Sequence, residues 1–177
     1  LFRTAASFIS SISEKKSVSV GETFFSNLRI RSKKKSFLPG LIIVGSYVEL
    51  STIQLKNLLE ISNCNPIELD VFEFFKITSS DNNQKRRNLF KNKFLKEIRF
   101  SFEKGKTPVL FTSRKFMSLD YSDQFNFYNS LARFIAELVA DLKYEIGYLI
   151  SKGGITTNVI LSNGLNADYV YLEGQIL

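Results

Sequence analysis

The chain of 177 residues contains no histidine. Histidine is the usual general base in proteins and the usual partner of a serine or cysteine nucleophile. Its absence excludes Ser-His and Cys-His catalysis, and it excludes imidazole metal sites. Any chemistry must therefore use backbone amides, hydroxyl groups, carboxylates and the cationic side chains of lysine and arginine.

Cysteine is almost absent as well, because Cys64 is the only one. A single thiol cannot form an internal disulfide, and no second thiol offers a zinc site. We predict no metal-ligating residues in the chain. The cysteine usage fits a reducing compartment, and we expect a cytoplasmic protein.

Long apolar runs are also missing. No run approaches the roughly 18 residues that a membrane span requires, and the first residues lack the apolar stretch of a signal peptide. The chain begins with Leu1 instead of methionine and ends in a strand-like segment. We therefore expect no membrane association, and we expect a piece of a longer protein.

The composition is otherwise that of a globular domain, with 44% hydrophobic and 23% charged residues. The net charge of +7 comes largely from two basic runs, at residues 33–35 and 85–87. Such runs are usually solvated loops or helix edges, so we do not expect nucleic acid as a partner. A basic nucleic-acid-binding domain nevertheless stays open as an alternative.

Short apolar runs alternate with amphipathic segments from residue 39 onward. Uniformly apolar runs predict strands buried on both faces, and 3–4 spacing of apolar residues predicts helices. The expected strands cover residues 41–44, 66–71, 108–112, 148–150 and 169–172, and the expected helices cover 51–62, 84–104, 122–142 and 156–165. This alternation predicts an α/β fold with three layers, a mainly parallel sheet and helices on both faces, as in Rossmann-like proteins.

Two further expectations concern local structure. Ser51 and Gln54 have the spacing of a capping box, which places the start of the first long helix at Ser51. The segment before residue 39 is rich in serine and lysine, and we expect a short helix within residues 1–12 and one strand near residues 24–30.

Three loops that follow strands have the composition of a ligand site. In open parallel sheets, ligands bind where the strands end and lead into helices. The loops are Gly45-Ser46-Tyr47, Thr112-Ser113-Arg114 and the segment from Ser151 to Thr157. A small residue at a strand exit is a competing explanation for Gly45 and Ser46, and a polar strand end is a competing explanation for Ser113 and Arg114.

The third loop is the most informative, because Gly153 and Gly154 are followed by Ile155 and Thr156. Adjacent glycines let the backbone approach a ligand, and the free N–H groups at the start of a helix attract phosphate. Lys152 adds a positive charge. The loop does not have the spacing of a Walker A motif, and a simple tight turn also explains the two glycines.

Taken together, these segments resemble the four-carbon acid sugar kinases, a family formerly described as a domain of unknown function. The matching segments occur in the family's order, and they are Phe2 to Phe8, Gly45 to Leu59, Thr112-Ser113-Arg114, Lys152 to Asn158, and Gly174-Gln175-Ile176. They extend over nearly the whole chain.

The resemblance implies the ATP-binding domain of a two-domain kinase that phosphorylates four-carbon sugar acids such as threonate or erythronate. Residues 1–12 would be the tail of a preceding substrate-binding domain, residues 13–37 a connector, and residues 38–177 a nucleotide-binding domain that is incomplete at its C-terminus. The preceding domain would bind the sugar acid, so this chain alone would be inactive.

The resemblance also implies the ligands and their site. ATP would bind at Gly45, Ser46, Ser113, Arg114, Lys152, Gly153, Gly154, Ile155 and Thr156, and Mg²⁺ would bridge its phosphates. The catalytic base is not identified in this chain, and a homodimer is a candidate assembly. A regulatory module that binds a sugar phosphate instead of ATP is the second alternative.

Overall fold

The computed structural model describes residues 21–34, 36–79, 83–114 and 120–171, and these form two compact units. The larger unit is Ile30–Asp168, and it carries the sheet. The smaller unit combines Leu1–Arg29 with Tyr169–Leu177.

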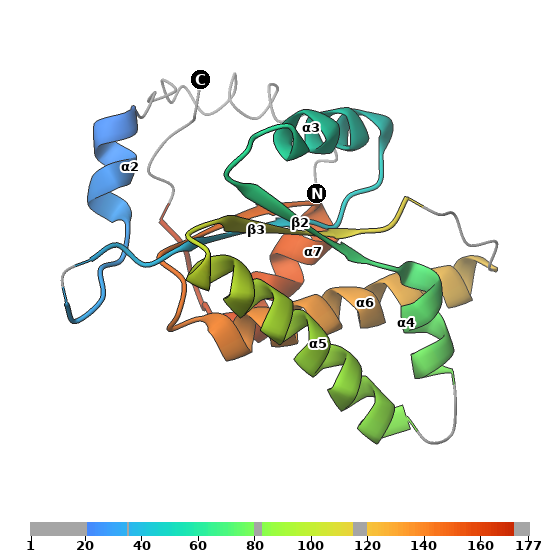
Figure 1. Cartoon of the computed structure of the whole chain (residues 1–177). Helices are drawn as coiled ribbons and strands as arrows, with labels where there is room; N and C mark the ends of the chain where they lie inside the picture. Colours follow the sequence, from blue (N-terminus) through green and yellow to red (C-terminus); the bar gives the residue numbers. More distant parts are fainter. Residues whose placement is uncertain (1–20, 35, 80–82, 115–119, 172–177) are drawn as a thin grey trace. The chain divides into compact units, whose positions relative to one another are not determined.

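The larger unit is built on four parallel strands in the order β2-β3-β1-β4 (Figure 1). The strands are β1 (Gly40–Val44), β2 (Cys64–Leu69), β3 (Thr107–Thr112) and β4 (Tyr148–Lys152). Every residue of β1 is buried, because β1 has a neighbour on each side and helices cover both faces. This confirms the expected α/β fold with a parallel sheet.

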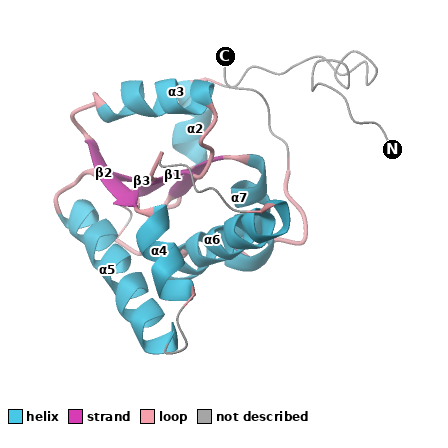
Figure 2. Cartoon of the chain, turned by 90° about the vertical axis from the view of Figure 1, so that its right-hand side faces the viewer, coloured by secondary structure: helices cyan, strands magenta, loops and turns pink. Residues whose placement is uncertain are grey.

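The helices divide unevenly between the two faces of the sheet, as Figure 2 shows. One face carries α3 (Glu49–Leu59). The other carries α4 (Val71–Thr78), α5 (Asn83–Glu103), α6 (Tyr121–Leu142) and α7 (Gly154–Val159), which continues into the π-helical turn η1 (Ile160–Gly164). The three layers are therefore a single helix, the sheet and a group of helices.

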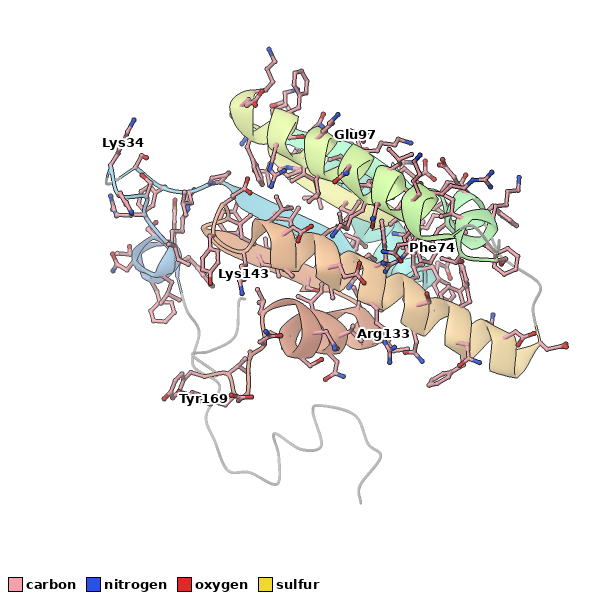
Figure 3. The ribbon with its side chains drawn as sticks, turned by 90° about the horizontal axis from the view of Figure 1, so that it is seen from below. Lys34, Phe74, Glu97, Arg133, Lys143 and Tyr169 are labelled. Carbon is pink, nitrogen blue, oxygen red and sulfur yellow. The ribbon has the colours of Figure 1, made fainter. Side chains whose placement is uncertain are left out.

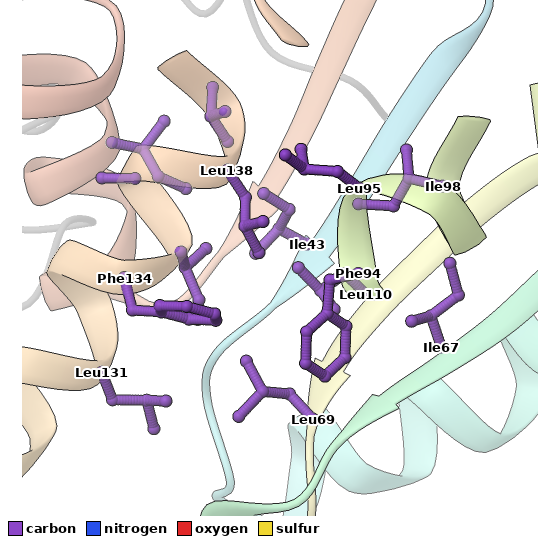
Figure 4. Packing of buried hydrophobic residues seen from close by; sticks show 14 of the residues in the cluster. Ile43, Ile67, Leu69, Phe94, Leu95, Ile98, Leu110, Leu131, Phe134 and Leu138 are labelled. Carbon is purple, nitrogen blue, oxygen red and sulfur yellow. The ribbon is translucent and has the colours of Figure 1, made fainter. Parts of the chain in front are cut away.

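Alternating side chains of β1 supply both hydrophobic cores, because successive residues of a strand point to opposite faces. Leu41 and Ile43 belong to the large core under α4, α5 and α6, whereas Ile42 and Val44 belong to the small core under α3. Figure 4 shows the large core, in which sheet residues such as Ile43 and Leu110 face Phe94, Phe134 and Leu138 of the helices.

The helices α5 and α6 lie side by side over the large core, as seen from below in Figure 3. Three ion pairs join them along their length: Arg87 with Glu137, Lys91 with Asp141, and Arg99 with Glu145 just beyond α6. Glu97 of α5 lies on the exposed side of this layer. The helix pair is thus held by apolar packing toward the sheet and by charges at its border.

Two strand and helix limits differ from the sequence-based expectation. The second strand ends at Leu69, and Val71 is already the first residue of α4. Asp70 causes the change, because its carboxylate accepts hydrogen bonds from the N–H groups of Phe72 and Glu73 and so caps the new helix. The predicted cap at Ser51 was also wrong: α3 begins at Glu49, and Ser51 is buried inside it.

The last helix begins earlier than expected and is not uniform. It starts at Gly154, and after Val159 it widens into the π turn that ends at Gly164. A Cβ on Gly164 would lie 2.9 Å from the carbonyl oxygen of Ala136. The glycine therefore lets this turn pack directly against the backbone of α6.

The smaller unit contains α2 (Glu22–Leu28), so the expected strand near residues 24–30 was wrong. The expected fifth strand was also wrong as far as it is described, because residues 169–171 form no strand. Leu172 and the expected helix within residues 1–12 lie outside the described residues. None of the helices in the described ranges is long and apolar enough to cross a membrane.

Candidate functional site

The candidate site lies where β1, β3 and β4 end at the same edge of the sheet. After β1 the chain turns to the face that carries α3, whereas after β3 and β4 it turns to the face that carries α6 and α7. The loop after β1 therefore separates from the loops on either side of it. Such a divergence opens a crevice at the carboxyl end of the strands, which is where open α/β sheets bind ligands.

Gly45 is the first residue of the loop after β1, and it is in close contact with α7. A Cβ at this position would overlap the Thr156 side chain, which is buried. The N–H of Gly45 donates to the carbonyl oxygen of Lys152 at 3.0 Å. Gly45 thus joins the end of β1 to both the end of β4 and the first turn of α7.

Gly153 makes the second close approach between these loops. Its φ of 118° lies in a region that favours glycine, and a Cβ there would lie 3.0 Å from the backbone nitrogen of Ser46. Gly154 differs, because its φ is not positive and no atom lies within 4 Å of a Cβ placed on it. Of the two adjacent glycines, only Gly153 is required by its backbone conformation.

Ser46 is held from two directions. Ser51 in α3 donates a hydrogen bond from its hydroxyl to the Ser46 hydroxyl at 3.0 Å, and Arg114 donates from Nη1 to the Ser46 carbonyl oxygen. Arg114 follows β3, so this contact ties the loop after β3 to the loop after β1. The buried hydroxyl of Ser51 therefore positions the loop after β1, which explains why it is not a helix cap.

Arg114 brings an incompletely paired positive charge to this edge. Its Nε and Nη2 atoms are buried without a hydrogen-bond partner among the described residues. Burial lowers the pKa of the guanidinium, and the negative charge of Glu68 partly opposes that change. The lowered pKa indicates that the surrounding protein stabilises the charged form of Arg114 less well than water does.

Lys152 is the last residue of β4, opposite Val44 in the sheet register. Its side chain is half-buried and forms no ion pair with any carboxylate of the described residues. Lys152 and Arg114 are therefore two cations at the same sheet edge, one at the end of β4 and the other just after β3, the two strands that flank β1.

Ser113 lies apart from the other predicted residues. It is buried, and its hydroxyl accepts a hydrogen bond from the N–H of Val71 at 3.1 Å. Its own N–H donates to the carbonyl oxygen of Leu69 at 2.9 Å. The first interaction connects the end of β3 to the start of α4, and the second connects it to the end of β2, so Ser113 supports the scaffold beneath the site.

A pocket of about 200 Å³ adjoins Gly45 on the side of α6 and α7. Its lining combines the loop after β1, the first half of α6 and the first turn of α7. The lining residues are Gly45, Tyr47, Thr112, Gln124, Phe125, Tyr128, Leu131, Ala132, Ile135, Ile155 and Thr156. Of these, only Gly45, Ile155 and Thr156 were among the predicted site residues.

Tyr47 and Tyr128 form one wall of this pocket, with stacked rings whose centroids are 5.4 Å apart. Burial is the main cause that raises the pKa of the Tyr128 hydroxyl, and the contact with Tyr47 adds to it. Sequence reasoning named Tyr47 only as part of the loop Gly45-Ser46-Tyr47, without a role, and missed Tyr128. The available signals were the tyrosine directly after Gly45-Ser46 and the aromatic residues at the start of the helix after β3.

The structure brings together Gly45, Ser46, Arg114, Lys152 and the segment 153–156 at one sheet edge, as the sequence predicted for residues that follow parallel strands. In the described part of the chain, no three acidic or cysteine side chains gather closely enough to hold a metal ion. The arrangement offers backbone N–H groups, hydroxyls and two cations. It suits an anionic ligand.

Comparison with known proteins assigns residues 41–177 to a family model described as a nucleotide-binding C-terminal domain. The match covers the four strands of the sheet, apart from Gly40 at the start of β1, and every element that builds the site. Searches of curated proteins and of solved structures returned no significant match.

Proposed function

The chain belongs to the nucleotide-binding C-terminal domain family, and on this basis we propose that it is the ATP-binding domain of a kinase that phosphorylates four-carbon sugar acids. The family supports a nucleotide as the ligand. The kinase activity and the sugar acid rest on the resemblance of the Gly45–Leu59 and Lys152–Asn158 segments to the four-carbon acid sugar kinases.

The observation that carries the proposal is the divergence of the loops at the end of β1. Beside the crevice that this divergence opens, the backbone of Gly45 and Ser46 lies against Gly153 and the first turn of α7. We place the phosphates of ATP along this edge, where the first N–H groups of a helical segment have no partner within the helix. Lys152 would offset part of the phosphate charge.

Arg114 has a different part in the proposal. Its unpartnered nitrogens are buried in this structure, and its Nη1 is engaged with the Ser46 carbonyl. We therefore assign Arg114 to holding the loop after β1 in position, with its charge adding to the positive potential of the edge.

Phosphoryl transfer depends on positioning and charge neutralisation more than on covalent chemistry. Mg²⁺ would be held by the ATP phosphates, because the described residues do not offer a carboxylate cage. In this proposal the sugar acid and the base that deprotonates its hydroxyl belong to a preceding domain.

Calorimetric titration with Mg-ADP tests the proposal. We expect saturable binding, and we expect Lys152→Met to weaken it by roughly tenfold to a hundredfold, because a charged hydrogen bond contributes about 1.5–3 kcal/mol. Lys96→Met is the matched control, since Lys96 is an exposed lysine on α5. Binding of a sugar phosphate but not of Mg-ADP would instead support the regulatory module, and binding of neither would refute an anion site at this edge.

A coupled ADP-release assay tests the reaction itself in two arms. With D-threonate or D-erythronate, we expect this chain to remain at background and a longer chain that includes the preceding domain to turn over. Turnover by this chain alone would place a catalytic base within residues 1–177.

A further inference from the structure

The pocket under Tyr47 has a chemistry different from that of the adjoining sheet edge. Among its lining residues in the described chain, none carries a charge. A phosphate or a carboxylate placed there would lose its hydration without gaining an ionic partner, which is strongly unfavourable. The pocket therefore suits an uncharged ligand group.

We propose that this pocket is the subsite for the nucleobase and that the Tyr47–Tyr128 pair is the stacking wall that holds it. The inference rests on the proposed function, because it assigns one part of the same nucleotide. It adds the orientation of the ligand: the base lies toward α6, and the phosphates lie toward Gly153 and Lys152.

The aromatic pair is suited to act as a wall. The rings are inclined by 22° with centroids 5.4 Å apart. A third ring inserted between them would require roughly 7 Å, since stacked carbon atoms approach to about 3.5 Å. The base must therefore stack on an outer face of the pair, meaning the face of either tyrosine ring that the other ring does not cover.

The pocket also has the size and the polarity that a base requires. A cavity of roughly 150 Å³ is enough to bind a benzene ring in another protein, and this pocket has about 200 Å³. The apolar floor is formed by Leu131, Ala132 and Ile135. Gln124 and Thr112 add uncharged donors and acceptors, which is the mixture that recognises the edge of a heterocycle.

The pocket and the phosphate edge are continuous. Gly45 and Thr156 both line the pocket. Their contact also joins the end of β1 to the first turn of α7. A single ligand that passes Gly45 would have its neutral end against the tyrosines and its anionic end against the loops. A nucleotide has this distribution of charge.

The experiment compares two ligands on three variants by calorimetric titration. The ligands are Mg-ADP and Mg-pyrophosphate, which differ by the nucleoside. The variants are Tyr47→Ala, which removes the exposed member of the pair, Gln124→Ala, which removes a polar group of the pocket, and Tyr144→Ala as the control at a tyrosine that is 85% exposed and outside the pocket. A melting curve of each variant confirms that it is folded.

We expect Tyr47→Ala to weaken Mg-ADP by roughly tenfold, since stacking of a base on an aromatic ring commonly contributes a factor of that order. Gln124→Ala should weaken Mg-ADP less. Both variants should bind Mg-pyrophosphate like the unmodified chain, and Tyr144→Ala should change neither ligand. The chain has no tryptophan, so tyrosine fluorescence gives a second measure of binding.

The outcomes separate this inference from the proposed function. Unchanged Mg-ADP affinity in folded Tyr47→Ala and Gln124→Ala would overturn the base subsite and leave nucleotide binding intact. Equal weakening of Mg-ADP and Mg-pyrophosphate would also overturn it, because the pocket would then serve the phosphates. Absence of Mg-ADP binding by the unmodified chain would overturn both.

Discussion

At the scale of the residue, the two adjacent glycines at the start of α7 differ in whether they tolerate a side chain. Gly153→Ala forces a side chain into a φ of 118° and against the nitrogen of Ser46, so we expect it to lower the free energy of unfolding by about 1–3 kcal/mol and to weaken Mg-ADP binding. Gly154→Ala places its Cβ in open space at a helical position, where we expect stability to be unchanged or higher by about 0.4–1 kcal/mol. Chemical denaturation of both variants measures the difference.

Gly154→Ala is the control for Gly153→Ala, because both substitutions add the same methyl group at neighbouring positions. Equal destabilisation by the two substitutions would contradict the assignment of the strained conformation to Gly153. The sequence predicted close approach and positive φ for both glycines, and in the folded chain the positive φ belongs to Gly153 and not to Gly154.

Tyr128 makes the stability of the chain depend on pH in the alkaline range. Its pKa is raised above the ordinary value of 10.0, so the unfolded chain releases this proton at a lower pH than the folded chain. The folded state therefore binds more protons between the two pKa values, and stability falls as the pH rises above about 10. We expect Tyr128→Phe to show a smaller decrease, measured by urea denaturation between pH 9 and 11.

Two variants complete that measurement. Burial also raises the pKa of the Cys64 thiol above its ordinary value of 9.0, so Cys64→Ala should remove a separate part of the decrease that begins at lower pH. Tyr144→Phe changes an exposed tyrosine and should leave the profile as it is. A Tyr128→Phe profile that matched the unmodified chain would show that the buried hydroxyl has no such role.

The ion pairs between α5 and α6 act at the scale of the element. Arg99 donates from Nη2 to Oε1 of Glu145, and its single Nε–H is shared between Oε1 and Oε2 of the same carboxylate. This hydrogen bonding is the main cause that raises the pKa of Arg99. Both side chains are partly exposed, at 44% and 40%. We therefore expect Glu145→Gln to cost only about 0.2–1 kcal/mol at low salt.

The salt dependence identifies the cause of that loss. At 1 M salt the screening length is about 3 Å, so the difference between Glu145→Gln and the unmodified chain should shrink. Glu97→Gln is the control, because Glu97 is exposed on α5 and has no ion pair among the described residues. A loss that persists at 1 M salt would point to a packing change instead of an electrostatic one.

Element types were predictable where burial leaves a simple pattern. Strands β1 and β3 are covered on both faces, so their segments are continuously apolar and their limits were predicted within a residue or two. Helix α4 was missed because the alternation of apolar and polar residues in β2 continues into its first residues, and only Asp70 marks the boundary. The expected cap at Ser51 failed because a hydroxyl with capping spacing bonds instead to Ser46 in the folded chain.

The candidate site was predictable only in part, for a related reason. Residues that follow parallel strands meet at one edge whatever their side chains, so Gly45, Arg114 and Lys152 were grouped correctly. The contact of Arg114 with Ser46 spans 68 positions, and the stacking of Tyr128 on Tyr47 depends on where α6 crosses the sheet. No local pattern records such contacts.

Ligand binding should be visible as stability at the scale of the whole molecule. A ligand that binds only the folded state adds about 2.7 kcal/mol when its concentration is a hundred times its dissociation constant. We therefore expect Mg-ADP to raise the melting temperature of the chain progressively with concentration, measured by differential scanning calorimetry. Mg²⁺ alone should have little effect, and a rise equal to that with Mg-ADP would place the stabilising site on the metal.

The order of the strands has a consequence for how the chain is made. Strand β1 lies between β3 and β4, and Leu41 pairs with Leu149, about a hundred positions later in the sequence. At a synthesis rate of about 5–20 residues per second, roughly 5–20 s pass before β1 can have both neighbours. For the last part of that interval β1 can pair with β3 alone, so one edge of a wholly buried strand stays uncovered until translation reaches β4. An uncovered strand edge can pair with other chains, so we expect the stretch of synthesis between β3 and β4 to be the one most exposed to aggregation.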